Sequence, residues 1–315
     1  MVLKVVDFHC DVLMKLLLDD RLHFKNDVTG ALDVTYERLQ DADTLLQTFA
    51  IYIPSKLNGS MTPILDSIDL FYEKVLTCPA MHLVRTSGDL DYCIQNGKIG
   101  ALLSLEGLDG LQGNLAMLRN LYQLGVRAAG ITWNYANWAA DGVMEPRGGG
   151  LTAKGKELIK ECNKLGIMLD MSHLSERGFW DSVALSDKPV FASHSNAKSI
   201  CDHPRNLTDL QIKTIIEGKG IVGITYVPMF LNSQSAATID DIIRHIDYIG
   251  SLGGEKHIML GSDFDGIDTY VERLAHPGQV IALKDALLKR YSTTQTEGFF
   301  SQNAMRFLCE QLPVS

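Results

Sequence analysis

Residues 2–11 read VLKVVDFHCD, and this stretch decides how the chain begins its fold. The apolar run 2–6 predicts a first β-strand, which ends at the polar residues that follow it. Because side chains alternate between the faces of a strand, we expect His9 and Asp11 on one face and Cys10 on the other. Such a pair is half of a metal site, although a strand-end histidine beside a solvated carboxylate explains it equally well.

Apolar, β-branched runs recur along the chain and predict eight strands. They cover residues 3–8, 48–53, 99–105, 126–132, 167–172, 189–193, 220–227 and 258–262. Helical periodicity lies between them, most clearly at 115–124, 154–165 and 239–249. Alternating strands and helices predict parallel βαβ units, and eight units favour an α/β fold of the TIM-like (β/α)8 barrel type. We expect a single domain over residues 1–315.

Composition excludes several classes of function. The chain has 315 residues, 46% hydrophobic content and a net charge of −9, which argues against nucleic-acid or anionic membrane partners. It has no apolar run long enough to span a bilayer and no secretion signal at its start, so we expect a cytoplasmic protein. Its six cysteines show no CxxC spacing, which predicts buried free thiols rather than a cysteine-ligated zinc site or disulfides.

Polar residues with metal-binding chemistry follow five of the predicted strands. They are His9 and Asp11 after the first, Glu106 after the third, His173 after the fifth, His194 after the sixth and Asp263 after the eighth. The carboxyl ends of barrel strands share one rim, so these side chains are expected to converge. Each has an ordinary explanation alone, such as a helix cap, but the set together predicts a metal site at that face.

Three histidines and three carboxylates exceed the needs of one four-coordinate zinc ion. They suit two metal ions about 3.5–4 Å apart, bridged by a carboxylate and a hydroxide. The donor set contains no cysteine, which disfavours a structural zinc. We therefore predict a hydrolytic centre of two Zn²⁺ ions, with Mn²⁺ or Co²⁺ as possible replacements.

Longer motifs then identify a family. They are SLEG at 104–107, ITWN at 131–134, GLT at 150–152, LDMSH at 169–173, FASHSNAKSICDHPRNLTD at 191–209, GSDFDG at 261–266 and NAMRF at 303–307. With DFHCD at 7–11, they make the chain resemble the bacterial-type members of the membrane dipeptidase (renal dipeptidase) family, in the metal-dependent amidohydrolase superfamily. The resemblance runs nearly end to end. It implies zinc-dependent hydrolysis of dipeptides, L-Xaa-D-Xaa included, by a homodimer.

The resemblance also implies a role for each residue. His9 and Asp11 correspond to ligands of one zinc, Glu106 to the bridging carboxylate, and His173 and His194 to ligands of the second zinc. Asp263 corresponds to an acid/base that also lies near the substrate amino group, and Arg205 to the anchor of the substrate carboxylate. The bridging hydroxide would attack the peptide carbonyl, and Asp263 would pass its proton to the leaving nitrogen.

One position departs from the mammalian pattern. Where those dipeptidases place a substrate-contacting histidine, this chain has Trp133 with Asn134 beside it. An indole N–H can donate a hydrogen bond but cannot take up a proton. Carbonyl polarisation would then come from the metal or from Asn134. Both residues are candidates for substrate binding, and packing at the barrel rim explains Trp133 equally well.

Weaker candidates and rival functions complete the interpretation. Asp265 and Asp268 follow the eighth strand and are candidates to orient ligands, whereas Asp170 is expected on a different face from His173. An N-acyl-amino-acid deacylase or lactam hydrolase could use the same binuclear core. A catalytically silent metal-binding scaffold is a further alternative, although such a chain would usually lack a ligand or the acid/base.

Overall fold

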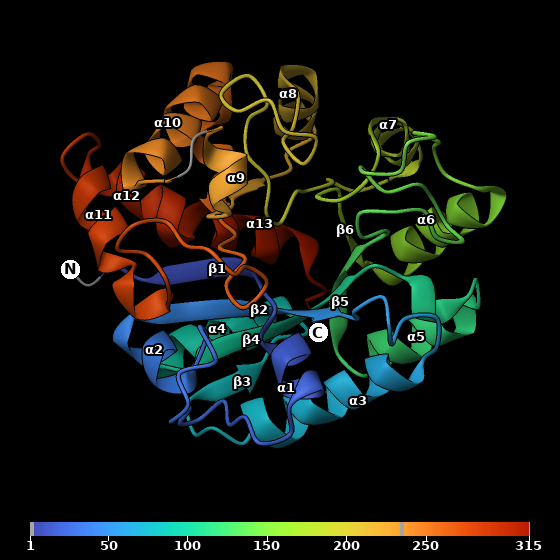
Figure 1. Ribbon diagram of the computed structural model, residues 1–315, viewed down its shortest axis with the longest axis horizontal. Coiled ribbons are helices and arrows are strands. Elements are labelled where there is room, and N and C mark those ends of the chain that lie inside the picture. The colour runs from blue at the N-terminus through green and yellow to red at the C-terminus, as the bar shows by residue number, and fades with distance from the viewer. Residues whose placement is uncertain (1–2, 234–235, 315) are drawn as a thin grey trace.

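The computed structural model describes residues 3–233 and 236–314 and shows a curled parallel sheet with helices packed around its outside (Figure 1). The strands are β1 (Val5–Cys10), β2 (Thr44–Tyr52), β3 (Met81–Leu83), β4 (Ile99–Glu106), β5 (Val126–Gly130), β6 (Met168–Asp170), β7 (Val222–Ile224) and β8 (Ile258–Leu260). The predicted α/β class and parallel sheet are confirmed.

The sheet runs in the order β6-β5-β4-β2-β1-β8-β7, and β3 pairs separately with β4. Single bridges join Asp170 to Phe191 and Ala192 to Val222, so the segment 191–192 connects the two ends of that order. These bridges support the predicted barrel. The prediction of a regular strand at 189–193 is wrong, because Pro189 has no amide hydrogen and the Ser193 amide donates to the Asp170 carboxylate.

Other strand bounds also differ from the structure; the predicted strands 167–172 and 220–227 shorten to Met168–Asp170 and Val222–Ile224. The second strand begins at Thr44 rather than at residue 48, since its parallel register with β1 already starts there. β3 was not predicted, because three residues at the edge of β4 carry no recognisable alternation. The early start of β2 and the added strand β3 lie far from the carboxyl ends of the strands and leave the rim unchanged.

The structure forms helices at the three stretches where periodicity predicts them, 115–124, 154–165 and 239–249, and further helices elsewhere. They are α1 (Val12–Leu18), α2 (Tyr36–Asp41), α3 (Thr62–Leu70), α4 (Ser87–Asn96), α5 (Leu115–Gln123), α6 (Ala153–Leu165), α7 (Glu176–Leu185), α8 (Asp209–Glu217), α9 (Pro228–Leu231), α10 (Ile239–Ile249), α11 (Ile281–Leu287), α12 (Thr293–Glu297) and α13 (Asn303–Gln311). In α6 the ends are also set by the sequence: the Thr152 side chain caps the first turn, and Gly166 ends the helix in the left-handed conformation.

Short 3-10 and π-helical turns join or extend these elements. They are η1 (Phe71–Val75), η2 (Asp109–Leu111), η3 (Gly250–Gly254), η4 (Glu255–His257), η5 (Pro277–Gln279) and η6 (Gly298–Gln302). No helix within 3–233 and 236–314 is both long and apolar enough to cross a bilayer.

Two hydrophobic cores hold the fold together. The larger packs strand residues against the surrounding helices, and Cys10 belongs to it. Phe8 belongs to the other core, because the register of β1 is irregular between Asp7 and Cys10. The smaller fills the inside of the curled sheet. There Phe8 of β1, Phe191 and Phe307 of α13 form three mutual ring contacts with centroids 5.7–6.3 Å apart. α13 therefore packs against β1 and the segment around Phe191 through Phe307.

The six cysteines are free thiols, as predicted. Five are buried and Cys309 is exposed.

Glycines allow the chain near the rim to pack closely. A Cβ at Gly223 or Gly261 would lie 1.8 Å from the Ser193 carbonyl oxygen. Because only glycine leaves room for that oxygen, these two residues decide how deeply the segment that carries His194 sits between its neighbours.

A buried histidine ties the loop that contains Ala197 to the end of α9. His245 of α10 accepts a hydrogen bond from the Ala197 amide at 3.1 Å through Nδ1, and its Nε2 lies 3.0 Å from the Leu231 carbonyl oxygen. The bond from Ala197 requires a neutral imidazole with its hydrogen on Nε2, because a protonated ring has no lone pair at Nδ1. Burial is the main reason that the pKa of His245 is lowered from 6.5 to about 4.

Acidification should therefore weaken the fold through His245. Its stabilisation is complete above the unfolded pKa of 6.5 and is lost as the pH falls toward 4, because the unfolded chain then binds a proton that the folded chain excludes. We expect the stability advantage of wild type over His245→Gln to shrink by about 2.5 kcal/mol between pH 7 and pH 4.5. Urea unfolding of both metal-free proteins measures this difference, and parallel pH profiles would contradict it.

Candidate metal centre

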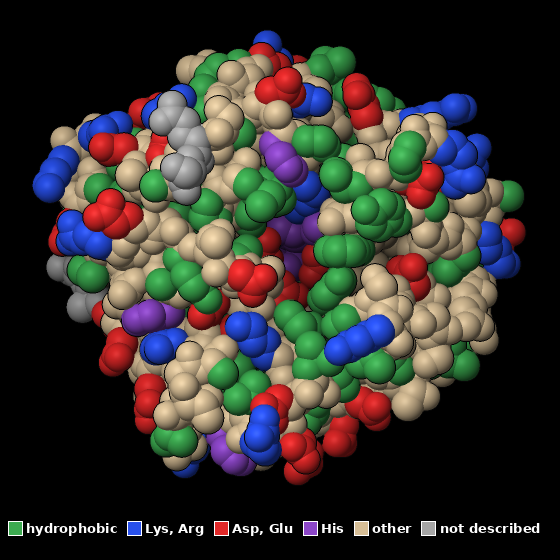
Figure 2. Space-filling model, in the orientation of Figure 1, with side chains coloured by type: hydrophobic (Ala, Val, Ile, Leu, Met, Phe, Trp, Pro, Cys, Tyr) green, Lys and Arg blue, Asp and Glu red, His purple; other side chains and the backbone are tan. Residues whose placement is uncertain are grey.

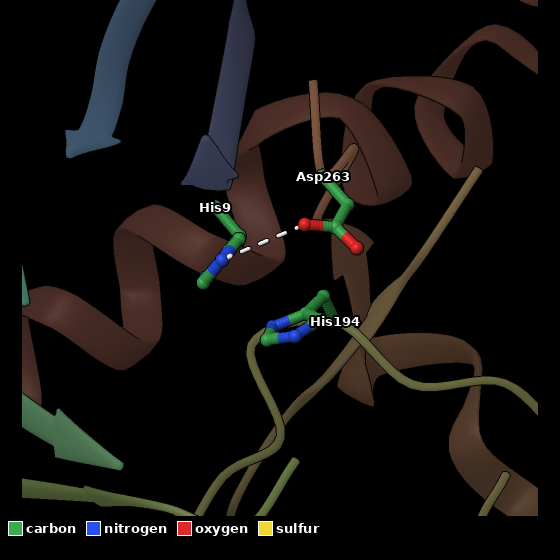
Figure 3. A group of neighbouring side chains, drawn as sticks. All are labelled: His9, His194 and Asp263. Carbon is green, nitrogen blue, oxygen red and sulfur yellow. Dashed lines mark ion pairs between the residues drawn. The ribbon is translucent and has the colours of Figure 1, made fainter. Parts of the chain in front are cut away.

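The carboxyl ends of the strands bring all six predicted residues together. His9 lies in β1 and Glu106 ends β4, while the other four follow strand ends in short loops. Figure 2 shows histidine and acidic side chains at the base of a hollow on this face. Figure 3 shows how the side chains of His9, His194 and Asp263 converge from three separate segments.

The potential ligand atoms form three overlapping groups, and within each group they lie no more than 4.8 Å apart. The groups are His9, Asp11 and Glu106; Glu106, His173 and His194; and His9, His194 and Asp263. Two of the three share Glu106, so the set fits two neighbouring cations better than one.

Glu106 stands between the histidines. Its Oε2 lies 3.2 Å from His9 Nε2, and its Oε1 lies 2.9 Å from His173 Nε2. Oε1 is also 3.8 Å from His194 Nε2. Each carboxylate oxygen therefore faces a different histidine group, which is the arrangement that a bridging ligand needs.

Several buried polar atoms at this centre have no hydrogen-bond partner among the described residues. They are both ring nitrogens of His9, Asp11 Oδ1 and Glu106 Oε2. Burying such atoms unpaired is costly, and a cation would satisfy them. The nitrogen and carboxylate donors present fit Zn²⁺, Mn²⁺ or Co²⁺.

The charges of the centre are strongly coupled. Burial opposes ionisation of Glu106, but His9 and His173 outweigh it and hold its pKa well below the usual value. Burial likewise opposes protonation of His9, yet the neighbouring carboxylates of Glu106 and Asp11 raise the pKa of His9 well above 6.5. Positive charge is therefore favoured beside Glu106.

Asp263 differs from the other carboxylates. Burial, with Asp11 and Glu106 adding to it, raises the pKa of Asp263 well above its usual value. Its Oδ1 lies 3.7 Å from His9 Nε2, and the residue adopts a left-handed backbone conformation with φ of 69°. A carboxyl group that binds protons readily beside candidate metal ligands suits proton transfer.

The outer nitrogens of two candidate ligands have protein partners. His173 Nδ1 lies 2.9 Å from Asn134 Oδ1, and His194 Nδ1 lies 2.6 Å from Ser193 Oγ. Their inner Nε2 atoms face each other at 2.9 Å. In the structure Asn134 thus contacts a candidate ligand, and its contact with substrate stays a prediction.

Arg205 is buried at the same place. Its guanidinium donates to the carbonyl oxygens of Ser172 and His194, and one Nη lies 3.2 Å from His173 Nε2. Its Nε has no partner within the described part of the chain. Burial lowers the pKa of Arg205 to about 10, which keeps it charged at neutral pH.

A cavity of about 460 Å³ opens beside the centre. Its wall includes Tyr52, Trp133, Arg205, Phe230 and Asp263. The Trp133 ring packs 5.1 Å from the Tyr52 ring and 6.2 Å from the His173 ring, measured between centroids. Trp133 therefore packs at the rim and faces the cavity at once, so both interpretations of it stand.

Sequence reasoning missed two buried carboxylates behind the ligands. Asp7 Oδ1 accepts from the amides of His9 and Ser262, which joins β1 to the end of β8. Asp170 contacts Ser172 and Ser193, the residues just before His173 and His194. Its place three residues before His173 was visible in the sequence, but its partner 23 positions away was not.

The orienting role predicted for Asp265 takes another form. Asp265 accepts from the amides of Asp33 and Val34 at 2.7 and 2.9 Å, so it secures a distant loop rather than a histidine. Asp268 lines the cavity.

Comparisons with known proteins agree with this arrangement. A family model described as membrane dipeptidase (peptidase family M19) matches residues 2–312. Dipeptidase tcpJ of Claviceps purpurea is 29% identical over 308 residues, which cover 93% of this chain and 72% of that protein.

Two solved structures resemble the whole chain. The crystal structure of a family M19 metallopeptidase called dipeptidase AC has a TM-score of 0.92 and 28% identity, with 100% of both chains covered. A metallopeptidase from Rhodobacter sphaeroides, liganded with a phosphinate mimic of the dipeptide L-Ala-D-Ala, has a TM-score of 0.90 and 27% identity, with 99% of this chain and 100% of that chain covered.

Gly266 offers a test of the centre's packing. A Cβ there would lie 2.2 Å from Asp11 Oδ2 and 2.7 Å from Asp263 Oδ1. Gly266→Ala should displace Asp11 and weaken zinc binding by an order of magnitude or more, because a displaced ligand no longer meets the ion's geometry. Competition against a chromophoric chelator measures this affinity. Gly250→Ala is the matched control, since a Cβ at Gly250 meets no atom within 4 Å; equal affinities in the two variants would refute the expectation.

Proposed function

This chain belongs to the membrane dipeptidase family, and from that premise we propose that it cleaves free dipeptides, L-Xaa-D-Xaa dipeptides included, at a centre of two zinc ions. It is a metallo-dipeptidase, a hydrolase that acts on peptide bonds. The observation that carries the proposal is Glu106, whose two oxygens face two separate histidine groups beside unpaired buried donors.

In this proposal His9 and Asp11 hold one ion, His173 and His194 hold the other, and Glu106 contacts both. The bound ions would supply a nucleophilic hydroxide at neutral pH and polarise the scissile carbonyl. Mn²⁺ or Co²⁺ would serve the same donors. The absence of cysteine from the groups of potential ligands within the described residues favours an open, hydrolytic centre over a structural one.

Asp263 would transfer a proton from the attacking water to the leaving nitrogen. Its raised pKa lets it take a proton from the attacking water and hold it on a carboxylate oxygen. The same oxygen then delivers the proton to the leaving nitrogen, which must depart as an amine. Asp263 lines the cavity with 14% of its side chain exposed, so substrate can reach it.

Arg205 would set the length of the substrate. Its guanidinium is a planar donor that suits a terminal carboxylate, and its Nε is free of protein partners among the described residues. A free amine near Asp263 and a free carboxylate at Arg205 leave room for one peptide bond between them. Trp133 and Asn134, at the cavity wall, would contact the residues of the dipeptide.

The stereochemical part of the proposal draws on a relative. The Rhodobacter sphaeroides metallopeptidase holds a mimic of L-Ala-D-Ala and shares this fold at 27% identity. We extend acceptance of a D-residue at the second position to this chain.

The wider setting completes the proposal. We propose one (β/α)8 barrel domain over residues 1–315, closed through the bridges at 191 and 192. We further propose a cytoplasmic homodimer.

A substrate panel tests the function. Zinc-loaded enzyme is given L-Xaa-L-Xaa, L-Xaa-D-Xaa and N-acetylated dipeptides, and EDTA-treated enzyme is the control. We expect cleavage of both free sets, loss of activity in EDTA and recovery with zinc. Amino acids released over time are the readout.

Other outcomes of that panel would favour the rivals. Cleavage of the N-acetylated set alone would show a deacylase, which needs no subsite for a free amine. No turnover of any substrate by protein with two bound ions would favour a silent scaffold.

Asp263→Asn separates proton transfer from metal binding. We expect kcat to fall by about 10²–10⁴-fold, because an amide cannot shuttle the proton, while the variant still binds two zinc ions. Asp141→Asn, at a buried carboxylate that pairs with Arg147 outside the centre, should retain its rate. A near-full rate in zinc-loaded Asp263→Asn would disprove the role.

A further inference from the structure

We infer that Asp170 is a positioning residue that sets the tautomer of His194 through Ser193 and thereby prepares His194 Nε2 to bind metal. The inference rests on the proposed role of His194 as a metal ligand. It extends the centre to a buried carboxylate that would touch neither metal nor substrate.

Asp170 ends β6 and is buried with 5% of its surface exposed. Its Oδ1 accepts from the amides of Ser172 and Ser193 at 3.0 and 2.9 Å and from Ser172 Oγ at 2.7 Å. Its Oδ2 accepts from Ser193 Oγ. One carboxylate therefore holds the two residues that immediately precede His173 and His194.

The direction of these hydrogen bonds carries the inference. A carboxylate only accepts, so the single hydroxyl hydrogen of Ser193 is committed to Asp170. Ser193 Oγ, 2.6 Å from His194 Nδ1, must then accept from that nitrogen. His194 is thereby held as the Nδ1–H tautomer, which leaves the Nε2 lone pair pointing toward Glu106 and His173.

Further contacts fix the ring in place. The His194 amide donates to Ser172 Oγ at 3.1 Å, so Asp170 also positions the His194 backbone through its other serine. His173 reaches the same tautomer by a different route, since its Nδ1 faces the amide oxygen of Asn134 at 2.9 Å. The two histidines thus have separate partners at Nδ1, although their Nε2 atoms face each other at 2.9 Å. The hydrogen bonds from Asp170 through Ser193 can therefore be changed without removing the partner of His173 Nδ1.

Asp170→Asn is the sharpest test because it reverses the direction of the hydrogen bonds that join Asp170, Ser193 and His194. The Asn amide nitrogen, placed at Oδ2, would donate to Ser193 Oγ. The Ser193 hydroxyl would then be released to donate to His194 Nδ1, which favours the Nε2–H tautomer. That tautomer has no lone pair for a metal.

Two measurements on the same set of proteins report the tautomer of His194 and the affinity for zinc. In metal-free protein with ¹⁵N-labelled histidine, NMR shifts should show His194 as Nδ1–H in wild type and as Nε2–H in Asp170→Asn. Chelator competition should show one of two bound zinc ions losing about 10–100-fold in affinity, the usual effect of removing a ligand's supporting partner. Ser193→Ala should lose the strict preference for Nδ1–H and show a smaller loss of affinity.

Asp141→Asn is the control for loss of a buried carboxylate. Asp141 is 2% exposed and accepts from Arg147 and the Gly149 amide. We expect it to lower the melting temperature of the metal-free protein without changing zinc affinity or the His194 tautomer. A purely structural role for Asp170 would give the same pattern in Asp170→Asn and would overturn the inference.

Two variants keep the test independent of folding and of the proposed function. Should Asp170→Asn not fold, an unchanged tautomer and affinity in Ser193→Ala would overturn the inference by itself. His194→Ala tests the ligand role separately: zinc affinity equal to that of wild type would refute His194 as a ligand. The tautomer measurement on metal-free protein would still decide whether Asp170 controls His194.

Discussion

Burial of the Glu106 carboxylate between imidazoles is the interaction on which the rest of this structure depends. Glu106 is 8% exposed, and its two oxygens face His9 and His173 at 3.2 and 2.9 Å. A carboxylate removed from water is tolerated only with positive charge nearby. Burial and the charge of Glu106 raise the pKa of Asp11 beside it, which shows how strongly this point disfavours further negative charge. Bound metal is the simplest counterpart to this assembly, and the chain's family, M19, includes a metallopeptidase of known structure.

A layer of hydrogen bonds behind the ligands gives the centre its geometry. Asp7 joins the ends of β1 and β8 through two backbone amides, and Asp170 does the same for the residues before His173 and His194. Both carboxylates are buried and accept only from neutral donors among these contacts. Their cost of burial is offset by several hydrogen bonds each, so they act as rigid supports. Ligand atoms held this firmly lose little entropy when a metal binds.

The loop after β8 combines strain with close packing. Asp263 and Asp265 both have positive φ values, and Gly266 leaves no room for a side chain beside Asp11. Such conformations cost energy, and surrounding contacts must maintain them. Here Asp265 is anchored to the amides of Asp33 and Val34. The strain places the Asp263 carboxyl where both the cavity and the metal ligands can reach it.

The sequence by itself determined the α/β class, most of the strands and helices, and which side chains gather at the rim. These features follow from local periodicity and from the rule that parallel strands end at one face. Sequence motifs also indicated the family. Tertiary structure alone decided the partners of those side chains: Asn134 meets His173 across 39 residues, and Asp170 meets Ser193 across 23. It also decided that Phe191 and Ala192 form isolated bridges: their amides donate to the carbonyl oxygens of Leu169 and Ile221, and the chain then leaves the sheet, because the next amide, that of Ser193, donates to the Asp170 carboxylate. Hydrogen bonds join atoms that are close in space, and no local sequence pattern indicates which distant residue will be the partner.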